Sequence, residues 1–212
     1  MIDFKSIIWD YNGTILDDLA IGVLSINKML HKRDLPLLST KAYREVFTFP
    51  VKSYYEAVGF NFKTEDWDQT ANEYIENYTS LLPQSAIFPE AIDLLSHFNK
   101  EGKMQFILSA MEQKMLDDST RNEDITKYFE EILGIDNIYA SSKIENGLQL
   151  MQKHNLQANE VCLLGDTTHD YEVAKQLKCN CILIASGHQS YKKLKGTGCP
   201  RVVRHLKEIT KT

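Results

Sequence analysis

Short apolar segments recur along the chain, and longer segments with helical periodicity separate them. The apolar segments cover residues 6–9, 104–108, 161–164 and 181–185, with a weaker one at 201–203. They are too short for helices and lack regularly alternating polar positions, which is typical of strands covered on both faces of a parallel sheet. The pattern therefore predicts five short, buried strands.

The segments between these predicted strands favour helices. Apolar residues spaced for one helix face follow Pro89 and Lys143: Ala91, Leu94, Leu95 and Phe98 in the first set, and Leu148, Met151 and Leu156 in the second. Strands that alternate with helices imply right-handed crossovers and an α/β sandwich built on a parallel sheet. In such sheets the site is expected at the carboxyl ends of the strands.

One long segment breaks the alternation of strands and helices. Between about Asp18 and Pro83 we predict no strand, but we expect helices near residues 21–30 and 67–78. Ten of the chain's 21 aromatic residues lie between Tyr43 and Tyr78. We therefore predict a small α-helical domain over residues 17–83, inserted into a core domain formed by residues 1–16 and 84–212.

Charge and composition exclude several classes of protein. The chain has 24 Lys and Arg against 29 Asp and Glu, a net charge of -5, so we expect no nucleic-acid partner. No apolar segment approaches the roughly 20 residues of a membrane helix, and no signal-peptide pattern begins the chain. We therefore expect a cytoplasmic monomer or homodimer without membrane contact. No C-x-x-C spacing occurs, so free thiols are expected at Cys162, Cys179, Cys181 and Cys199.

Polar side chains follow three of the predicted strands. Asp10 follows the first, Ser109 the second, and Gly165, Asp166 and Asp170 the third. A single Asp after a strand is often a helix cap, but three strands that deliver such groups to one edge indicate a site. Because no cluster of His or Cys accompanies them, these oxygens suit a hard cation, and Mg²⁺ held together with substrate phosphate is the expected ligand.

The residues at these positions resemble the motifs of the haloacid dehalogenase superfamily. Residues 10–17, Asp-Tyr-Asn-Gly-Thr-Ile-Leu-Asp, resemble its first motif, D-x-D-G-T-[LI]-x-D, with Asn12 in place of the second Asp. Ser109 matches the second motif, Lys143 the third, and residues 165–170 the fourth, G-D-x-x-x-D. The resemblance implies a Rossmann-like core with a C1 cap, and residues 164–190 look most like the phosphoglycolate phosphatase branch.

This resemblance implies a Mg²⁺-dependent phosphatase that acts on a small phosphorylated metabolite. Asp10 would attack the phosphoryl group and form an aspartyl-phosphate that is then hydrolysed. Mg²⁺ would be bound by Asp10, the main-chain carbonyl of Asn12 and Asp166, with Asp170 supporting the metal directly or through water.

The same resemblance suggests which groups contact the substrate. The Ser109 hydroxyl and the Gly13 and Thr14 amides would bind the phosphoryl oxygens, and Lys143 would add positive charge and orient Asp10. In the cap, residues 47–52 combine apolar side chains with Lys52. Lys52 is a candidate for recognising the rest of the substrate, and a solvated surface lysine is an equally weighted interpretation.

Asn12 departs from the motif at a position that matters for the reaction. In the family's phosphatases the second Asp protonates the leaving oxygen and later deprotonates water, which an amide cannot do. General acid–base catalysis contributes about 10² to 10⁴ in rate, so we expect slow turnover or slow dephosphorylation of Asp10. An Asn-Gly sequence is also prone to deamidation, which would convert a fraction of molecules to Asp at position 12.

Several interpretations of Asn12 are compatible with the sequence. It is either an introduced substitution or a native residue, in an enzyme whose substrate has a good leaving group or in a weakly active homologue that binds a phosphorylated ligand or partner. Phosphonatases and dehalogenases of the superfamily also lack the second Asp. Asp166 and Asp170 argue against a dehalogenase, which needs no Mg²⁺, and a phosphonatase would require a Schiff-base lysine, for which Lys52 is the candidate.

Overall fold

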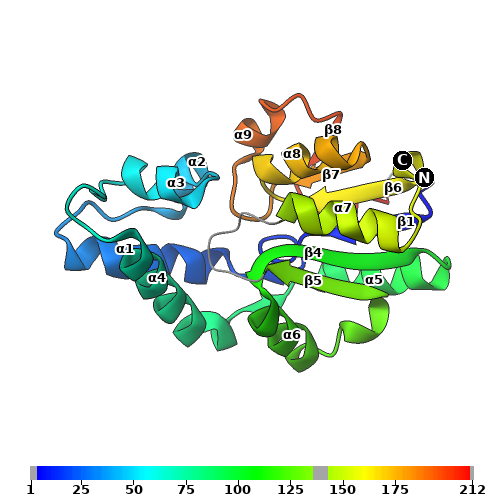
Figure 1. The fold of residues 1–212 in the computed structure, drawn as a ribbon, viewed down its shortest axis with the longest axis horizontal. Helices are drawn as coiled ribbons and strands as arrows, with labels where there is room; N and C mark the ends of the chain where they lie inside the picture. Colours follow the sequence, from blue (N-terminus) through cyan, green and yellow to red (C-terminus); the bar gives the residue numbers. More distant parts are fainter. Residues whose placement is uncertain (1–3, 136–142, 211–212) are drawn as a thin grey trace.

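The core of the molecule is a six-stranded sheet whose neighbouring strands are all parallel (Figure 1). The computed structural model describes residues 4–135 and 143–210. The strand order is β5-β4-β1-β6-β7-β8, which confirms the predicted α/β class. The strands are β1 (Ser6–Trp9), β4 (Met104–Glu112), β5 (Glu131–Ile135), β6 (Val161–Gly165), β7 (Asn180–Ile184) and β8 (Arg201–Val203).

The edge strand β5 is the one strand of this sheet that the sequence pattern does not predict. Its sequence, Glu-Ile-Leu-Gly-Ile, begins with a charged residue and contains a glycine, and its first three residues are only half-buried. Because an edge strand has a neighbour on one side only, it does not need the continuous apolar run that identifies the central strands. The other five strands match the predicted segments to within a few residues.

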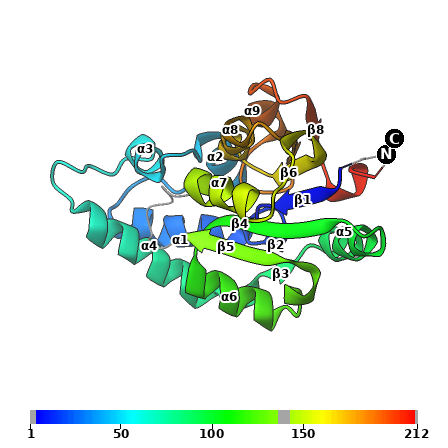
Figure 2. The same ribbon diagram turned by 45° about the vertical axis from the view of Figure 1, so that its right-hand side comes forward.

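Helices cover both faces of the sheet (Figures 1 and 2). Ile7 and Trp9 of β1 pack with α5 (Pro89–Lys100) and α6 (Gln113–Asn122) on one face. Ile8 packs with α7 (Lys143–Lys153) and α8 (Thr168–Leu177) on the other. Successive side chains of a strand point to opposite faces, so each strand supplies both cores. A shorter helix, α9 (Tyr191–Lys195), lies between β7 and β8 in the chain.

Four helices form the inserted segment, which lies beyond the carboxyl ends of the strands (Figure 1). They are α1 (Leu19–Lys32), α2 (Thr40–Val46), α3 (Val51–Ala57) and α4 (Trp67–Leu81). They share a separate core of aliphatic and aromatic side chains, which includes Tyr43, Tyr54, Tyr55 and Phe60. Where the chain leaves and re-enters the main domain, β2 (Leu16–Asp17) pairs antiparallel with β3 (Ala86–Ile87). The domain boundaries themselves stay a prediction.

The inserted segment, called the cap below, is hydrogen-bonded to the core domain. The guanidinium of Arg44 donates to the carbonyls of Ala185 and Gln189. In return, the Gln189 amide and the Lys193 ammonium donate to the carbonyl of Phe47, at 2.9 and 2.7 Å. These bonds hold residues 44–47 of the cap against the loop that follows β7, close to the strand ends.

Two expectations drawn from composition can be compared with the structure. The four cysteines are free thiols, as predicted. Within residues 4–135 and 143–210, no helix is both long enough and apolar enough to cross a membrane.

We predict that Leu163→Ala, in β6, lowers the free energy of unfolding by about 2–5 kcal/mol, because it leaves a cavity in the core. Leu163 is fully buried in the core between the sheet and helices α7 and α8. The matched control is Leu148→Ala on α7, whose side chain is 49% exposed and should change the stability by less than about 0.5 kcal/mol. Urea unfolding followed by circular dichroism measures both. Equal losses would contradict this assignment of the core.

Candidate active site

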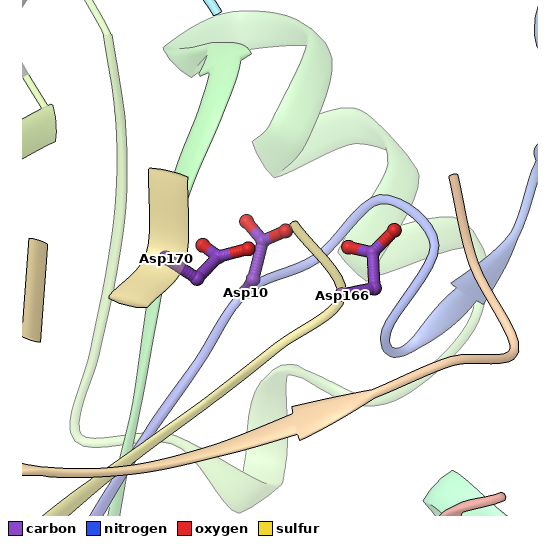
Figure 3. A group of neighbouring side chains, drawn as sticks. All are labelled: Asp10, Asp166 and Asp170. Carbon is purple, nitrogen blue, oxygen red and sulfur yellow. The ribbon is translucent and has the colours of Figure 1, made fainter. Parts of the chain in front are cut away.

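Three carboxylates lie side by side at the carboxyl edge of the sheet (Figure 3). Asp10 directly follows β1, Asp166 directly follows β6, and Asp170 lies in the first turn of α8. One oxygen from each residue lies within 4.8 Å of the other two, and all three residues are buried. The structure thus brings together three of the four residues predicted as metal ligands. The fourth contact, to the main-chain carbonyl of Asn12, stays a prediction.

Local hydrogen bonds fix the orientation of Asp170 and Asp166. Asp170 is the third residue of a capping box, and its Oδ2 accepts from the amide and the hydroxyl of Thr167 at 2.9 and 2.7 Å. Asp166 accepts from the main-chain amide of His188 at 2.5 Å and from the hydroxyl of Thr14 at 3.2 Å. Each carboxylate is therefore held by groups from its own helix or from neighbouring loops.

Two glycines allow the loops to approach Asp166 closely. A Cβ atom on Gly13 would lie 2.4 Å from Asp166 Oδ2, and one on Gly187 would lie 2.2 Å from the same oxygen. Gly13 also has a φ of +70°, in the left-handed region that favours glycine. Both loops therefore require glycine to pack against this carboxylate.

Lys143 supplies a buried positive charge to the cluster. Its ammonium, at the start of α7, donates to Asp10 Oδ1 at 2.7 Å and to Asp170 Oδ1 at 2.6 Å. Burial disfavours the ammonium form, but the two carboxylates outweigh this effect and raise the pKa of Lys143 above its usual value. Lys143 is therefore a cation that bridges Asp10 and Asp170.

The cluster carries more negative charge than this one lysine can balance. Burial raises the pKa of Asp10 well above its usual value, the charges of Asp170 and Asp166 raise it further, and Lys143 opposes the shift. Burial also raises the pKa of Asp166 to about 6, although nearby His188 lowers it. Burial acts on Asp170 too, but the charge and hydrogen bond of Lys143 keep its pKa below the usual value. An added cation would relieve this excess, and three converging carboxylates are the oxygen donors that a hard divalent ion prefers.

Asn12 is a hydrogen-bond donor to an acidic neighbour that sequence reasoning missed. Its amide nitrogen donates to Asp18 Oδ2 at 2.9 Å and to the hydroxyl of Tyr78 at 2.8 Å. The Tyr78 hydroxyl in turn donates to Asp18 Oδ2 at 2.6 Å. The position that holds an acid in the family motif here holds an amide whose N–H groups are directed at a carboxylate.

Asp18 also forms a buried ion pair with His188. His188 Nε2 donates to Asp18 Oδ1 at 2.9 Å, and the Tyr43 hydroxyl lies 2.9 Å from Nδ1. Burial lowers the pKa of His188, but the Asp18 carboxylate outweighs it and raises the pKa to about 9. Burial likewise opposes ionisation of Asp18, yet His188 keeps its pKa below the usual value. The pair therefore joins the start of α1 to the loop after β7.

The sequence contains little signal for this ion pair. The last acid of the first motif is Asp17, whose side chain is exposed, whereas the next residue, Asp18, is buried. The sequence alone does not show which of two adjacent acids, Asp17 or Asp18, has the buried side chain. The glycine before His188 was the available signal, because Gly187 marks a close approach of the backbone to Asp166.

Two of the predicted phosphoryl donors are already paired within their own turn. The Gly13 amide donates to the carbonyl of Leu16 at 2.9 Å and to Asp18 Oδ1 at 2.8 Å, and the Thr14 amide donates to the carbonyl of Tyr11 at 3.3 Å. These bonds shape the turn after β1. The phosphoryl contacts expected of the two amides stay predictions.

Ser109 lies inside β4 rather than at its end. The pairing of β4 with β5 shifts register between Leu108 and Glu112, which interrupts the ladder at this serine. Its hydroxyl accepts from the Met111 amide at 3.0 Å and lies 3.4 Å from the Asn12 carboxamide oxygen. Ser109 therefore reaches the same edge of the sheet as residues 10–12.

Lys52 lies in the cap, with its ammonium over two aromatic rings. The side chain is exposed on α3, and its ammonium lies 5.3 Å from the centre of the Phe62 ring and 5.8 Å from that of Trp67. The neighbouring Val51 lines the cavity described next. A substrate contact by Lys52 stays a prediction, and it requires this side chain to turn away from the two rings.

A cavity of about 390 Å³ extends from the carboxylates into the cap. This volume lies within the range of small-molecule sites, roughly 300–1,000 Å³. Asp10, Asn12 and Lys143 line it on the core side. On the cap side the lining is mainly aromatic and aliphatic: Tyr43, Phe47, Phe49, Val51, Tyr54, Tyr55, Trp67, Ala71, Tyr74, Ile75 and Tyr78.

Comparison with known proteins identifies the fold and its relatives. A family model described as haloacid dehalogenase-like hydrolase matches residues 7–184. The chain is 21% identical to a phosphoglycolate phosphatase of Vibrio parahaemolyticus, an alignment that covers 98% of this chain and 95% of the relative. A phosphoglycolate phosphatase of Aliivibrio fischeri is also 21% identical, over 88% of this chain and 86% of the relative.

Solved structures agree with the family match. A haloacid dehalogenase-like protein from Agrobacterium tumefaciens superposes with a TM-score of 0.81 at 17% identity, covering 97% of this chain and 96% of that one. A haloacid dehalogenase-like hydrolase from Streptococcus pneumoniae superposes with a TM-score of 0.76 at 21% identity, covering 99% and 98%. At these identities the likeness establishes the fold.

We predict that His188→Gln lowers the free energy of unfolding at pH 6 by about 3 kcal/mol, because it leaves Asp18 buried without its cation. His188 binds its proton more tightly when folded, with a pKa of about 9, than when unfolded, where the value is near 6.5. Its contribution is therefore complete below about pH 6.5 and is lost as the pH rises through about 9.

Urea unfolding at pH 6, 8 and 9.5 measures this difference between wild type and His188→Gln. The matched control is the same substitution in an Asp18→Asn background, where the cost at pH 6 should be much smaller because the buried negative charge is gone. A cost that does not depend on pH, or is equal in both backgrounds, would contradict the ion pair.

Proposed function

Because the chain belongs to the family of haloacid dehalogenase-like hydrolases, we propose that it is a phosphatase that hydrolyses a small phosphate monoester through an aspartyl-phosphate on Asp10. The observation that carries this proposal is the position of Asp10. Its carboxylate is buried among Asp166, Asp170 and Lys143 and also lines the cavity that leads into the cap. The phosphatases among its relatives support the same reaction.

We propose Mg²⁺ as the cation of this site, held by Asp10, Asp166 and the Asn12 carbonyl and supported by Asp170. The three converging carboxylates and their excess negative charge fit a hard divalent ion. When bound, Mg²⁺ would neutralise the repulsion between the carboxylates and an anionic phosphate ester.

Lys143 and Ser109 are the proposed partners of the phosphoryl group. The bond from Lys143 to Asp10 Oδ1 orients the nucleophile and keeps positive charge beside the atom that forms the new bond. The Ser109 hydroxyl lies on the neighbouring strand, near the Asn12 side chain, where it can donate to a phosphoryl oxygen. In a buried site such fixed donors act without the reorganisation that water would require.

Asn12 leaves the reaction without the proton donor of the family motif. Its amide donates to Asp18 and to the Tyr78 hydroxyl, and an amide releases no proton at neutral pH. We therefore propose that the chain is a slow phosphatase towards esters whose leaving group needs a proton. The alternative, a weakly active homologue that binds a phosphorylated ligand, is separated from this proposal by the first experiment below.

We predict that Asn12→Asp raises the Mg²⁺-dependent rate of hydrolysis of alkyl phosphates by about 10² to 10⁴, because it restores the acid–base group. The new carboxyl group would lie beside Asp18, and two neighbouring carboxylates raise each other's tendency to hold a proton, which suits a general acid. Release of inorganic phosphate from a panel of alkyl esters measures the rate.

The control for this gain is the double variant Asp10→Asn, Asn12→Asp, which should lose it entirely. Phosphate release that survives the loss of Asp10 would overturn the aspartyl-phosphate. No gain in Asn12→Asp would instead favour the ligand-binding alternative.

We also predict that Mg²⁺ raises the melting temperature of the wild-type protein and that Asp166→Asn abolishes most of this effect, because a ligand that binds the folded state stabilises it. The matched control is Asp118→Asn, an acid on α6 that is paired with Lys114 and lies outside the cluster. Differential scanning fluorimetry over a Mg²⁺ titration measures the shift. Equal shifts in both variants would place the cation elsewhere.

A further inference from the structure

We propose that the substrate is an aryl phosphate, the phosphate monoester of an uncharged aromatic alcohol. This inference rests on the phosphatase function proposed above and narrows it to a substrate class. It is carried by the walls of the cavity, by the lack of a Lys or Arg among the described residues that line its cap side, and by the missing proton donor at Asn12.

The cavity offers an aromatic surface to the part of the substrate beyond the phosphate. Tyr55 and Trp67 line one part of it with ring centres 5.7 Å apart, and Phe47 and Tyr54 line another with centres 5.2 Å apart. Aromatic side chains favour a flat, apolar partner through offset and edge-to-face contacts. A two-carbon acid would leave most of this wall uncovered.

The charges around the cavity disfavour a substrate with a second anionic group. Among the described residues that line it, Lys143 is the one Lys or Arg, and its ammonium is bound by Asp10 and Asp170. The other charged groups of the lining include the acids Asp18 and Glu112. His188, which also lines the cavity, is a cation bound by Asp18, so a carboxylate on the substrate would be desolvated with no unpaired cation among these residues to receive it, which is costly.

The wall of the cavity contains two buried polar atoms that lack a hydrogen-bond partner among the described residues. The Tyr54 hydroxyl and His169 Nε2 both belong to residues that line the cavity, and neither has a hydrogen-bond partner among the described residues. Tyr54 is only 1% exposed. His169 is covered by the ring of Phe49, stacked at 4.8 Å. Both atoms are closed off from the cavity as well as from solvent, so a polar substituent on the ring would pair with one of them only after the wall moves.

Asn12 also favours an aryl ester, because an amide cannot protonate the leaving oxygen. When Asp10 attacks the phosphorus, the bond between phosphorus and the ester oxygen breaks and that oxygen keeps the electron pair. A phenol, with a pKa near 10 as in tyrosine, leaves as the phenolate without help, whereas an alkanol, with a pKa closer to the value of about 15.7 for water, needs a proton that Asn12 cannot give. The phenolate then takes its proton from solvent.

Hydrolysis of the phosphoenzyme completes the reaction cycle. A water oxygen attacks the phosphorus, the bond to Asp10 breaks with its electron pair returning to the carboxylate, and the water proton is released with inorganic phosphate. Because Asn12 cannot deprotonate this water, the second step is slow relative to the first. Wild type should therefore show a burst of phenol release, close to one per active site, before the steady rate.

The charge preference is tested on the wild-type protein with Mg²⁺ and three esters: phenyl phosphate, 4-carboxyphenyl phosphate and 2-phosphoglycolate. We expect kcat/KM for phenyl phosphate to exceed that for each acid by about 100-fold or more, because each acid buries an unpaired charge. The 4-carboxyphenyl ester is the informative control, since its phenol is the better leaving group. Equal or faster hydrolysis of either acid overturns the inference.

A variant of the cavity wall tests the same charge preference through a gain of activity towards an anionic ester. Ile75 lines the cavity from α4 and is only half-buried, so a lysine can be accommodated there. Ile75→Lys should raise kcat/KM for 4-carboxyphenyl phosphate at least about tenfold relative to phenyl phosphate. Ile75→Met, which keeps the wall apolar, should leave the wild-type preference unchanged. No change in preference in a folded Ile75→Lys protein counts against the cavity as the substrate site.

The leaving-group argument is tested with phenyl and benzyl phosphate, which share a ring and differ in the acidity of the alcohol. Wild type should strongly prefer phenyl phosphate. Asn12→Asp should lower the ratio of kcat/KM for phenyl phosphate to kcat/KM for benzyl phosphate by at least about tenfold. An unchanged ratio overturns the inference. If neither protein shows Asp10-dependent hydrolysis of any ester, the proposed phosphatase function fails as well, whereas a reversed preference between substrates overturns the substrate class alone.

Discussion

The burial of three carboxylates around a single ammonium is the constraint on which the rest of this structure depends. Asp10, Asp166 and Asp170 converge from two strand ends and a helix start, and Lys143 balances part of their charge. Unpaired buried charges are costly, so the surrounding elements must supply compensation. The capping box of α8 and the His188 amide supply it, and the negative charge that remains supports the divalent cation proposed above.

A second buried ion pair extends this arrangement towards the cap. Asp18 accepts from His188, Tyr78 and the Asn12 amide, and Tyr43 of α2 lies against the far nitrogen of His188. The residue that replaces the motif's acid is therefore part of the chain's own hydrogen-bond network. An aromatic cavity adjoins this network, so the proposed substrate preference and the amide at position 12 belong to one region of the molecule.

Much of the fold follows from local pattern. The central strands are apolar on both faces, so residues 6–9, 104–108 and 161–164 could be recognised without any neighbour. The edge strand β5 could not, because its half-buried sequence is set by its position at the side of the sheet. In the site, Asp10, Asp166 and Asp170 were identifiable from their place after strands. Asp18 was not identifiable, because it follows another acid, Asp17, and only the geometry at the start of α1 decides which of the two side chains is buried.

The sequence by itself determined which chemical groups stand at the ends of the strands, because the two-residue period of a strand and the turn after it are local properties. It also determined the aromatic content of the cap. Only the tertiary structure decided that Lys143 bridges two carboxylates, that His188 pairs with Asp18 across 170 positions of the chain, and that Lys52 lies over aromatic rings. These contacts join distant segments, and their geometry depends on how the cap and the core pack together.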